Sequence, residues 1–335
     1  MAALKLNRLP SPTFSWLHVN SAEVSVQELS DSAPELAVPA GVTLTQAALQ
    51  KDGIPETCSE ELGTFLADQQ TQCSTLTGSS AEPVRMQLEQ NGVSALCIDA
   101  KAGAELTVIQ YLHADTAIQT VVRTENSASV KLVQIFDSAQ IISDTAAVLE
   151  DSAKLELVQV YLGGGSTVSG TTVTMNGTRS VFQSQIGYRL DGSDRLDLNQ
   201  NIIQNGRKSE SQTEVKGVLR GAASKVFRGT IDFRHGAVGA EGAENEDVLL
   251  MDETVQNKTV PVILCAEEDV AGSHGASIGQ ISPEHIFYMQ SRGIPAEQII
   301  ELMAQTKLGT VIRRIGDPQT ERSIYRRLGR EDLDE

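Results

Sequence analysis

The chain has 335 residues, 40% of them apolar and 4% aromatic, which is an ordinary globular composition with room for about two domains. Its formal charge, 27 − 44 = −17, argues against a nucleic acid or an anionic membrane surface as the main partner. No run approaches 18 apolar residues, and the start has no apolar stretch followed by a small-residue cleavage site. We therefore expect a soluble cytoplasmic protein.

Residues 1–92 are expected to form a mixed N-terminal region. Residues 8–20, which include the only tryptophan, Trp16, are typical of a segment docked on a surface. Short helices are expected over residues 45–50 and 60–69, between loops rich in Ser, Thr, Pro and Gly. The four cysteines form no CxxC motif, which favours reduced thiols that pack as small apolar residues. These are Cys58, Cys73, Cys97 and Cys265.

An internal repeat begins near residue 93. Short segments rich in Val, Ile and Leu recur, each introduced by a small polar turn, and each carries a glutamine. The glutamines are Gln110, Gln134, Gln159 and Gln183. Their numbers differ by 134 − 110 = 24, 159 − 134 = 25 and 183 − 159 = 24, so the repeat is nearly regular. Glutamines at matched positions predict stacked amide ladders, in which each side chain bonds to the next copy.

The repeat predicts a β-solenoid. The leucine pattern of a leucine-rich repeat is absent, and a propeller blade needs about 40–45 residues. Stacked coils bury their inward apolar positions only against the next coil, and parallel crossovers favour the right-handed sense. We therefore expect a mainly β protein whose residues 93–281 form a right-handed parallel β-helix, with about six or seven coils over residues 100–265.

The spacing of apolar residues changes after the repeat and becomes typical of helices. Ser282 is an expected N-cap, followed by proline at the first helical position, and Gly293 is an expected C-terminal glycine. Pro295 opens a second expected helix. Its predicted apolar stripe is Ile299, Ile300, Leu302 and Met303. Residues 282–335 are thus expected to form a small C-terminal helical domain.

Local catalytic motifs are missing. The chain has no P-loop, no G-x-S-x-G elbow and no HExxH motif. A β-solenoid fold also makes a carbohydrate-active enzyme a candidate function. Such an enzyme would need convergent carboxylates along a groove. Candidates for that chemistry are Asp191, Asp194, Asp197, Glu244, Glu246 and Asp247, for which solvated acidic surface is the simpler interpretation.

One stretch combines a histidine with glycines. His274 lies between Gly272 and Gly275, so another group can approach the backbone closely. From the residues alone, that group is either a ligand or only the neighbouring coil.

Ordered motifs then point to a family. Residues 227–231 (FRGTI), 247–252 (DVLLMD), 273–276 (SHGA) and 286–294 (IFYMQSRGI) occur in this order. The chain resembles the SufB/SufD family of iron–sulfur cluster assembly proteins, and its His-Gly-Ala version is more like SufD. The resemblance is strong over residues 215–310.

The resemblance implies a non-catalytic scaffold. Such proteins are right-handed parallel β-helices that pair through their cores, here with a SufB-like subunit or a second copy. They bind the SufC-type ABC ATPase through C-terminal helices. No cofactor is expected to be bound permanently, and a transient iron–sulfur cluster is expected at the dimer interface. The alternative is a self-associating β-helix with no metal role.

The resemblance also assigns residues. His274 matches the histidine of the cluster-building interface, where a neutral imidazole can hold iron. The expected ATPase contact consists of Phe287, Tyr288, Arg292 and Gly293. Plainer interpretations are core packing for the two aromatic residues and helix-end charge complementarity for Arg292. The sequence departs from the family pattern at Gly272 and Gly275, where a cysteine and a glutamate are usual, so it has no evident sulfur acceptor.

Overall fold

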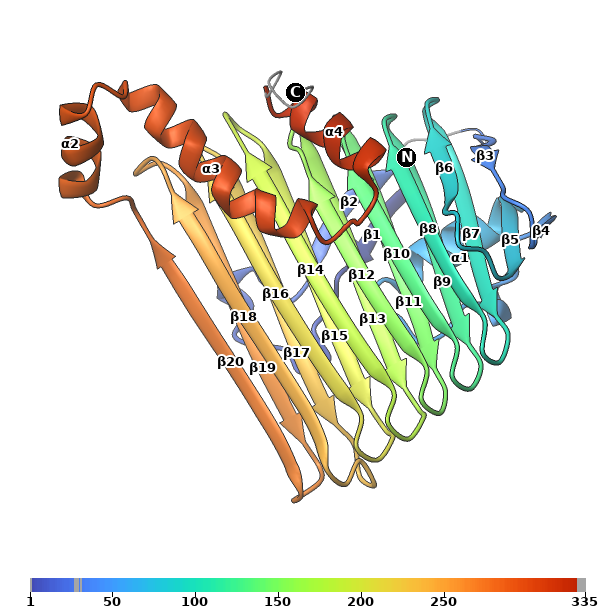
Figure 1. Cartoon of the computed structure of the whole chain (residues 1–335). Coiled ribbons are helices and arrows are strands. Elements are labelled where there is room, and N and C mark those ends of the chain that lie inside the picture. Colours follow the sequence, from blue (N-terminus) through green and yellow to red (C-terminus); the bar gives the residue numbers. More distant parts are fainter. Residues whose placement is uncertain (1, 27–29, 31, 330–335) are drawn as a thin grey trace.

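The computed structural model describes residues 2–26, 30 and 32–329; residues 330–335 of the predicted helical domain lie outside this set. Two nine-stranded sheets face each other along a rod, and successive strands alternate between them (Figure 1). Within each sheet, strands of successive coils pair in parallel, as in Ser129↔Lys154 and Gln140↔Ser166. The architecture is therefore the predicted parallel β-helix.

The first sheet contains the odd-numbered strands from β5 onward and ends at β4. Its strands are β4 (Val42–Ala48), β5 (Gln72–Gly78), β7 (Gly92–Ala100), β9 (Thr116–Thr124), β11 (Gln140–Leu149), β13 (Ser166–Met175), β15 (Arg195–Gln204), β17 (Ser224–Phe233) and β19 (Gln256–Cys265).

The second sheet contains the even-numbered strands from β6 onward and ends at β3. Its strands are β3 (Glu35–Ala37), β6 (Val84–Leu88), β8 (Glu105–Leu112), β10 (Ser129–Phe136), β12 (Lys154–Tyr161), β14 (Val181–Leu190), β16 (Glu210–Leu219), β18 (Ala240–Leu250) and β20 (Val270–Gly279). At the N-terminal end the edge strands run antiparallel to their neighbours, β3 to β6 and β4 to β5, whereas β19 and β20 are parallel edge strands at the other, open end.

The lumen between the sheets holds the largest apolar cluster, to which each strand from β5 to β18 contributes at least one residue. The predicted amide ladder lies in it. Gln134 Nε2 donates to Gln110 Oε1 at 2.7 Å, and Gln159 Nε2 donates to Gln134 Oε1 at 2.9 Å. Gln183 was expected to continue this ladder, which is wrong: Ile186 is the register partner of Gln159, and Gln183 is exposed. The coil has lengthened by that point, so the earlier spacing no longer holds.

The N-terminal residues cover the outer face of the first sheet. The hairpin β1 (Ala2–Leu6) and β2 (Ala22–Val26) and the helix α1 (Glu60–Asp68) form an apolar layer with that sheet. Helix α1 confirms one predicted helix. The other, over residues 45–50, is wrong because most of this segment belongs to β4, where it pairs with β5. Short 3-10 turns, η1 (Ser15–Leu17) and η2 (Lys51–Gly53), complete the region.

The segment 8–20 is anchored over β15 and β17, because Asn199 Nδ2 donates to the Arg8 carbonyl and Arg228 Nε donates to the Val19 carbonyl. Trp16 and Phe14 nevertheless remain exposed and stack on each other. The segment is therefore docked as expected, but its aromatic residues do not make the attachment.

Helices cover part of the outer face of the second sheet. They are α2 (Pro283–Ser291), α3 (Ala296–Ile312) and α4 (Pro318–Arg327). Helices α3 and α4 lie across the strands, while α2 projects past the open end (Figure 1). In α3 the buried side chains include Ile299, Leu308 and Val311, whereas Leu302 of the predicted stripe is exposed. Ion pairs fix α3, including Arg189 Nη1 to Glu301 Oε1 at 2.9 Å. None of the helices in the described part of the chain is long and apolar enough to cross a membrane.

Candidate functional site at the open end

The open end of the β-helix is formed by β19 and β20. In β20 every residue after Val270 is exposed, because no further coil covers this strand. His274 is the register partner of Glu244 on β18, so both side chains lie on the lumen face. The imidazole therefore lies at the mouth of the lumen, one strand beyond a buried carboxyl group.

Glu244 is buried without a hydrogen-bond partner among the described residues. Its side chain is 5% exposed, and no hydrogen bond among the described residues ends on its carboxyl group. A Cβ atom on Gly229 of β17 would overlap its Oε2, so the glycine makes the space that this carboxyl occupies. Burial, together with the charge of Glu246, raises the pKa of Glu244 to about 7.

An ion pair lies beside Glu244. Lys225 Nζ on β17 contacts Glu246 Oε1 on β18, and both side chains are fully buried. Thr259 Oγ1 accepts from Lys225 at 3.1 Å and donates to Glu246 Oε2 at 2.6 Å. Burial lowers the pKa of Lys225, and the adjacent carboxylate opposes that shift. Two carboxyl groups thus share one ammonium group at the end of the lumen.

The cysteine nearest the opening does not join His274. Cys265 is the last residue of β19 and is exposed, and its thiol donates to the Glu267 carbonyl at 3.0 Å. His274 is the fifth residue of β20, on the other sheet. Among the described residues no group of three or more His, Cys, Asp or Glu side chains could hold a metal ion. Within one chain, His274 therefore supplies an exposed donor rather than a closed metal centre.

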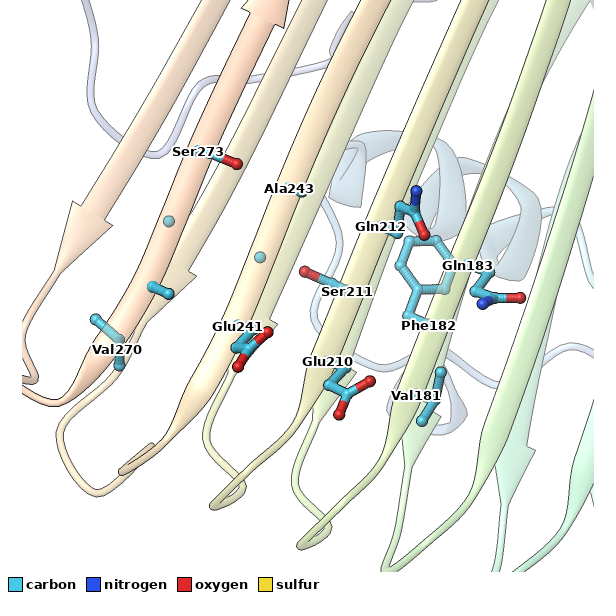
Figure 2. A pocket seen from close by; sticks show the side chains of 13 residues that line it. Val181, Phe182, Gln183, Glu210, Ser211, Gln212, Glu241, Ala243, Val270 and Ser273 are labelled. Carbon is cyan, nitrogen blue, oxygen red and sulfur yellow. The ribbon is translucent and has the colours of Figure 1, made fainter.

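A groove of about 490 Å³ crosses the other face of the second sheet near this end (Figure 2). Gln183, Gln212, Glu210, Glu241 and Ser273 line it, so its charged side chains are acidic. Ser273 precedes His274 along β20, and alternate side chains of a strand point to opposite faces. The groove and the histidine are therefore on opposite faces of the same edge strand.

The predicted ATPase-contact residues lie together on α2 and at its end. Phe287 and Tyr288 are 73% and 58% exposed, so core packing does not account for them. The Arg292 guanidinium lies 5.4 Å from the Tyr288 ring centroid. Ser282 caps the helix by accepting from His285 N at 3.2 Å, and Gly293 ends it with φ of +87°, as predicted.

The candidate carboxylates of a carbohydrate-active enzyme do not converge. Asp197 binds Arg228 and Asn7 on the outer face of the first sheet. Glu244 and Glu246 are buried in the lumen rather than solvated, and Asp247 contacts Lys307 of α3 on the outer face of the second sheet. Asp191 and Asp194 lie in the turn between β14 and β15, where Asp194 Oδ2 accepts from Asp191 N at 3.0 Å. The six carboxylates therefore do not gather on one face as the catalytic groove of such an enzyme requires.

The fold and its open end define a parallel β-helix subunit with an appended helical arm. Residues 84–306 match the family described as SUF system FeS cluster assembly, SufBD core domain. This segment covers about two thirds of the chain. The chain therefore belongs to the SufBD family of iron–sulfur cluster assembly proteins.

Individual relatives agree with this membership. The SufD protein of Bacillus subtilis is 28% identical over 163 residues, which are 49% of this chain and 37% of that protein. The SufD protein of Escherichia coli is 23% identical over 241 residues, 69% of this chain and 57% of that protein. A chloroplastic SufBD family protein of Arabidopsis thaliana is 25% identical over 50% of this chain and 30% of its own length. The chain thus matches less than two thirds of the length of these relatives.

Proposed function

We propose that this chain is a non-catalytic scaffold subunit of a cytoplasmic Suf-type complex, with the transient iron–sulfur cluster as its cargo. Membership of the SufBD family and the name SufD of two relatives support this role. We also propose the division into a mixed region (1–92), a β-helix (93–281) and an ATPase-docking helical domain (282–335).

The observation that carries the proposal is the open end of the β-helix. An edge strand presents unpaired backbone N–H and C=O groups, which can pair with another chain. The edge strands at the other end, β3 and β4, have three and seven residues, whereas β19 and β20 have ten residues each and are the longer edges. We propose that a SufB-like subunit or a second copy pairs with the protein here.

His274 is the proposed contact with iron at that interface. It lies on the lumen face at the edge strand, where a partner's ligands can reach the same ion. A neutral imidazole nitrogen suits iron, and the carboxyl of Glu244 lies on the adjoining strand. Gly272 stands where a cysteine is usual in the family, so the sulfur-accepting thiolate is proposed to come from the partner.

Helix α2 is the proposed contact with a SufC-type ATPase. Its exposed aromatic side chains, Phe287 and Tyr288, lie on a helix that projects from the rod. Neighbouring exposed aromatic side chains are typical of protein–protein contacts. Arg292 and Gly293 end this helix and set its direction.

Co-purification with the SufC-type ATPase of the same organism tests this assignment. The native chain is expected to retain the ATPase on a column at low salt, and a Phe287→Ala/Tyr288→Ala variant is expected to lose it. The matched control is Phe14→Ala/Trp16→Ala, which removes equally exposed aromatics elsewhere and should retain binding. Failure of the native chain to bind the ATPase would contradict the scaffold role.

The free edges by themselves also favour a second function, a self-associating β-helix without a metal role. This alternative predicts oligomers that form through β19 and β20 without any ATPase. Because the scaffold can also pair with a second copy, retention of the ATPase on the column distinguishes the two functions: the alternative predicts oligomers that retain no ATPase.

A further inference from the structure

Two cysteines meet on the outer face of the first sheet, far along the rod from the open end. Cys73 lies on β5 and Cys97 on β7, and the Cys73 thiol donates to Cys97 Sγ at a sulfur–sulfur distance of 3.3 Å. The side chains are 5% and 8% exposed. They belong to the apolar cluster that α1 covers with Leu62 and Leu66. The pair is therefore held in a nearly dry environment.

The strand register is unfavourable for a disulfide. Cys73 is the partner of Ala95, and Thr75 is the partner of Cys97, so the cysteines are diagonal neighbours. Diagonal Cα atoms on adjacent strands lie about 7–8 Å apart, whereas a disulfide usually needs about 4.4–6.8 Å. By contrast, two metal–sulfur bonds of about 2.3 Å in a line separate the sulfurs by about 4.6 Å. The two sulfurs, 3.3 Å apart, need to separate by about 1.3 Å to reach that distance.

A cationic side chain lies beside the pair. Cys97 accepts the hydrogen bond from Cys73, and the Arg123 guanidinium lies against Cys97. Arg123 also binds Asp99 at 2.8 Å, which holds the guanidinium in place but partly offsets its charge. Ala47 and Ala95 are the register partners of Cys73, so small side chains flank it along the sheet.

We propose that Cys73 and Cys97 form a two-coordinate site for a soft monovalent cation of the Cu(I) class. Thiolates select soft ions, and two sulfurs with no third side-chain donor among the described residues suit an ion that accepts linear coordination. On binding, both S–H bonds break, the two protons go to solvent, and two sulfur–copper bonds form. No electron is transferred, so the step needs no oxidant. The site is independent of the proposed scaffold function.

The test uses a Cys58→Ser/Cys265→Ser chain, which leaves only the Cys73–Cys97 pair. Anaerobic titration with Cu(I) against a bathocuproine chelator is expected to give one tightly bound ion per chain. X-ray absorption should give two sulfur neighbours. A further Cys73→Ser or Cys97→Ser change should weaken binding by about 100-fold or more, because loss of a ligand exceeds the 10–100-fold cost of losing an outer partner.

The two measurements keep the proposal falsifiable if the single-serine variants fail to fold, because X-ray absorption needs no change at the pair. Absence of tight binding in the two-cysteine chain would overturn the proposal. So would a single sulfur neighbour, or a Cys73–Cys97 disulfide-linked peptide in place of the metal complex.

Discussion

At the scale of single residues, the protein places charged groups where most folds have apolar side chains. Lys225 and Glu246 are fully buried in the lumen. Asp144 of β11 is fully buried under the N-terminal layer on the outer face of the first sheet. Each has polar partners: Thr259 bonds to both members of the ion pair, and Thr57 and Gln119 donate to Asp144. Removing a partner from such a group costs more than the pair contributes, because the remaining charge stays buried.

Lys225→Met tests the lumen ion pair. The variant leaves Glu246 and Glu244 close together without a cation, so we expect the free energy of unfolding to fall by about 3–5 kcal/mol. Lys225→Met/Glu246→Gln should recover part of the loss. Urea unfolding followed by circular dichroism measures both. Lys101→Met, which removes an exposed pair with Glu125, is the control and should leave stability unchanged. Equal effects of the two single changes would contradict the burial argument.

The buried carboxyl group of Asp144 predicts that the free energy of unfolding depends on pH. Burial raises its pKa from an ordinary 3.8 to about 6, although the hydrogen bonds from Thr57 and Gln119 oppose the shift. The folded state therefore holds this proton where the unfolded state releases it, and stability decreases as the pH rises from about 4 through 6. The rise in pKa corresponds to about 3 kcal/mol.

Asp144→Asn removes that dependence, since the amide does not ionise and its oxygen can still accept from Gln119. Urea unfolding at pH 4.5 and pH 7.5 should show that the variant gains about 2 kcal/mol relative to the native protein between the two pH values, because part of the full effect is already present at pH 4.5. A native-minus-variant difference that stays constant between the two pH values would contradict the assignment.

At the scale of elements, the repeat period determined what could be predicted. The nearly constant spacing of Gln110, Gln134 and Gln159 placed them in register, and the ladder follows from that spacing alone. The period then grows: the register partners at the start of β8 and β10 differ by 129 − 105 = 24, and those of β18 and β20 by 270 − 240 = 30. The added length gave no sequence signal, which is why the expectation for Gln183 failed.

The same period explains what was missed. Cys73 and Cys97 are one coil length apart in the sequence, so their approach was predictable once the repeat was extended upstream to β5. The position of His274 beside Glu244 could not be predicted. The small residues of β20 do not show the alternation of apolar and polar side chains that marks a half-buried strand. Residues 45–50 were predicted to be helical, but pairing with β5 overrides that local preference.

Gln134→Ala tests the amide ladder. The change removes the donor to Gln110 and the acceptor for Gln159, and leaves both amides buried. We expect a loss of about 2–4 kcal/mol in the free energy of unfolding, since each unsatisfied buried group costs about 1–3 kcal/mol. Gln183→Ala, exposed and outside the ladder, is the matched control and should change little. If both variants unfold at the same urea concentration as the native protein, the ladder has no energetic role.

At the scale of the whole molecule, the rod is asymmetric. One end carries the antiparallel edge strands β3 and β4, and the N-terminal layer and α3 cover part of the two outer faces. The other end stays open, with His274 on its edge strand and α2 projecting beside it (Figure 1). This arrangement supports the proposed scaffold role, in which one end pairs with another subunit and one helix binds a second partner.

Anaerobic cluster reconstitution on the complete complex with the ATPase and the pairing subunit tests the open end most directly. His274→Ala is compared with Ser273→Ala, its neighbour on the opposite face of β20, after both complexes are shown to assemble. The account predicts that the histidine variant loses most of the cluster absorbance while the serine variant keeps it. Equal cluster yields in the two complexes would contradict it.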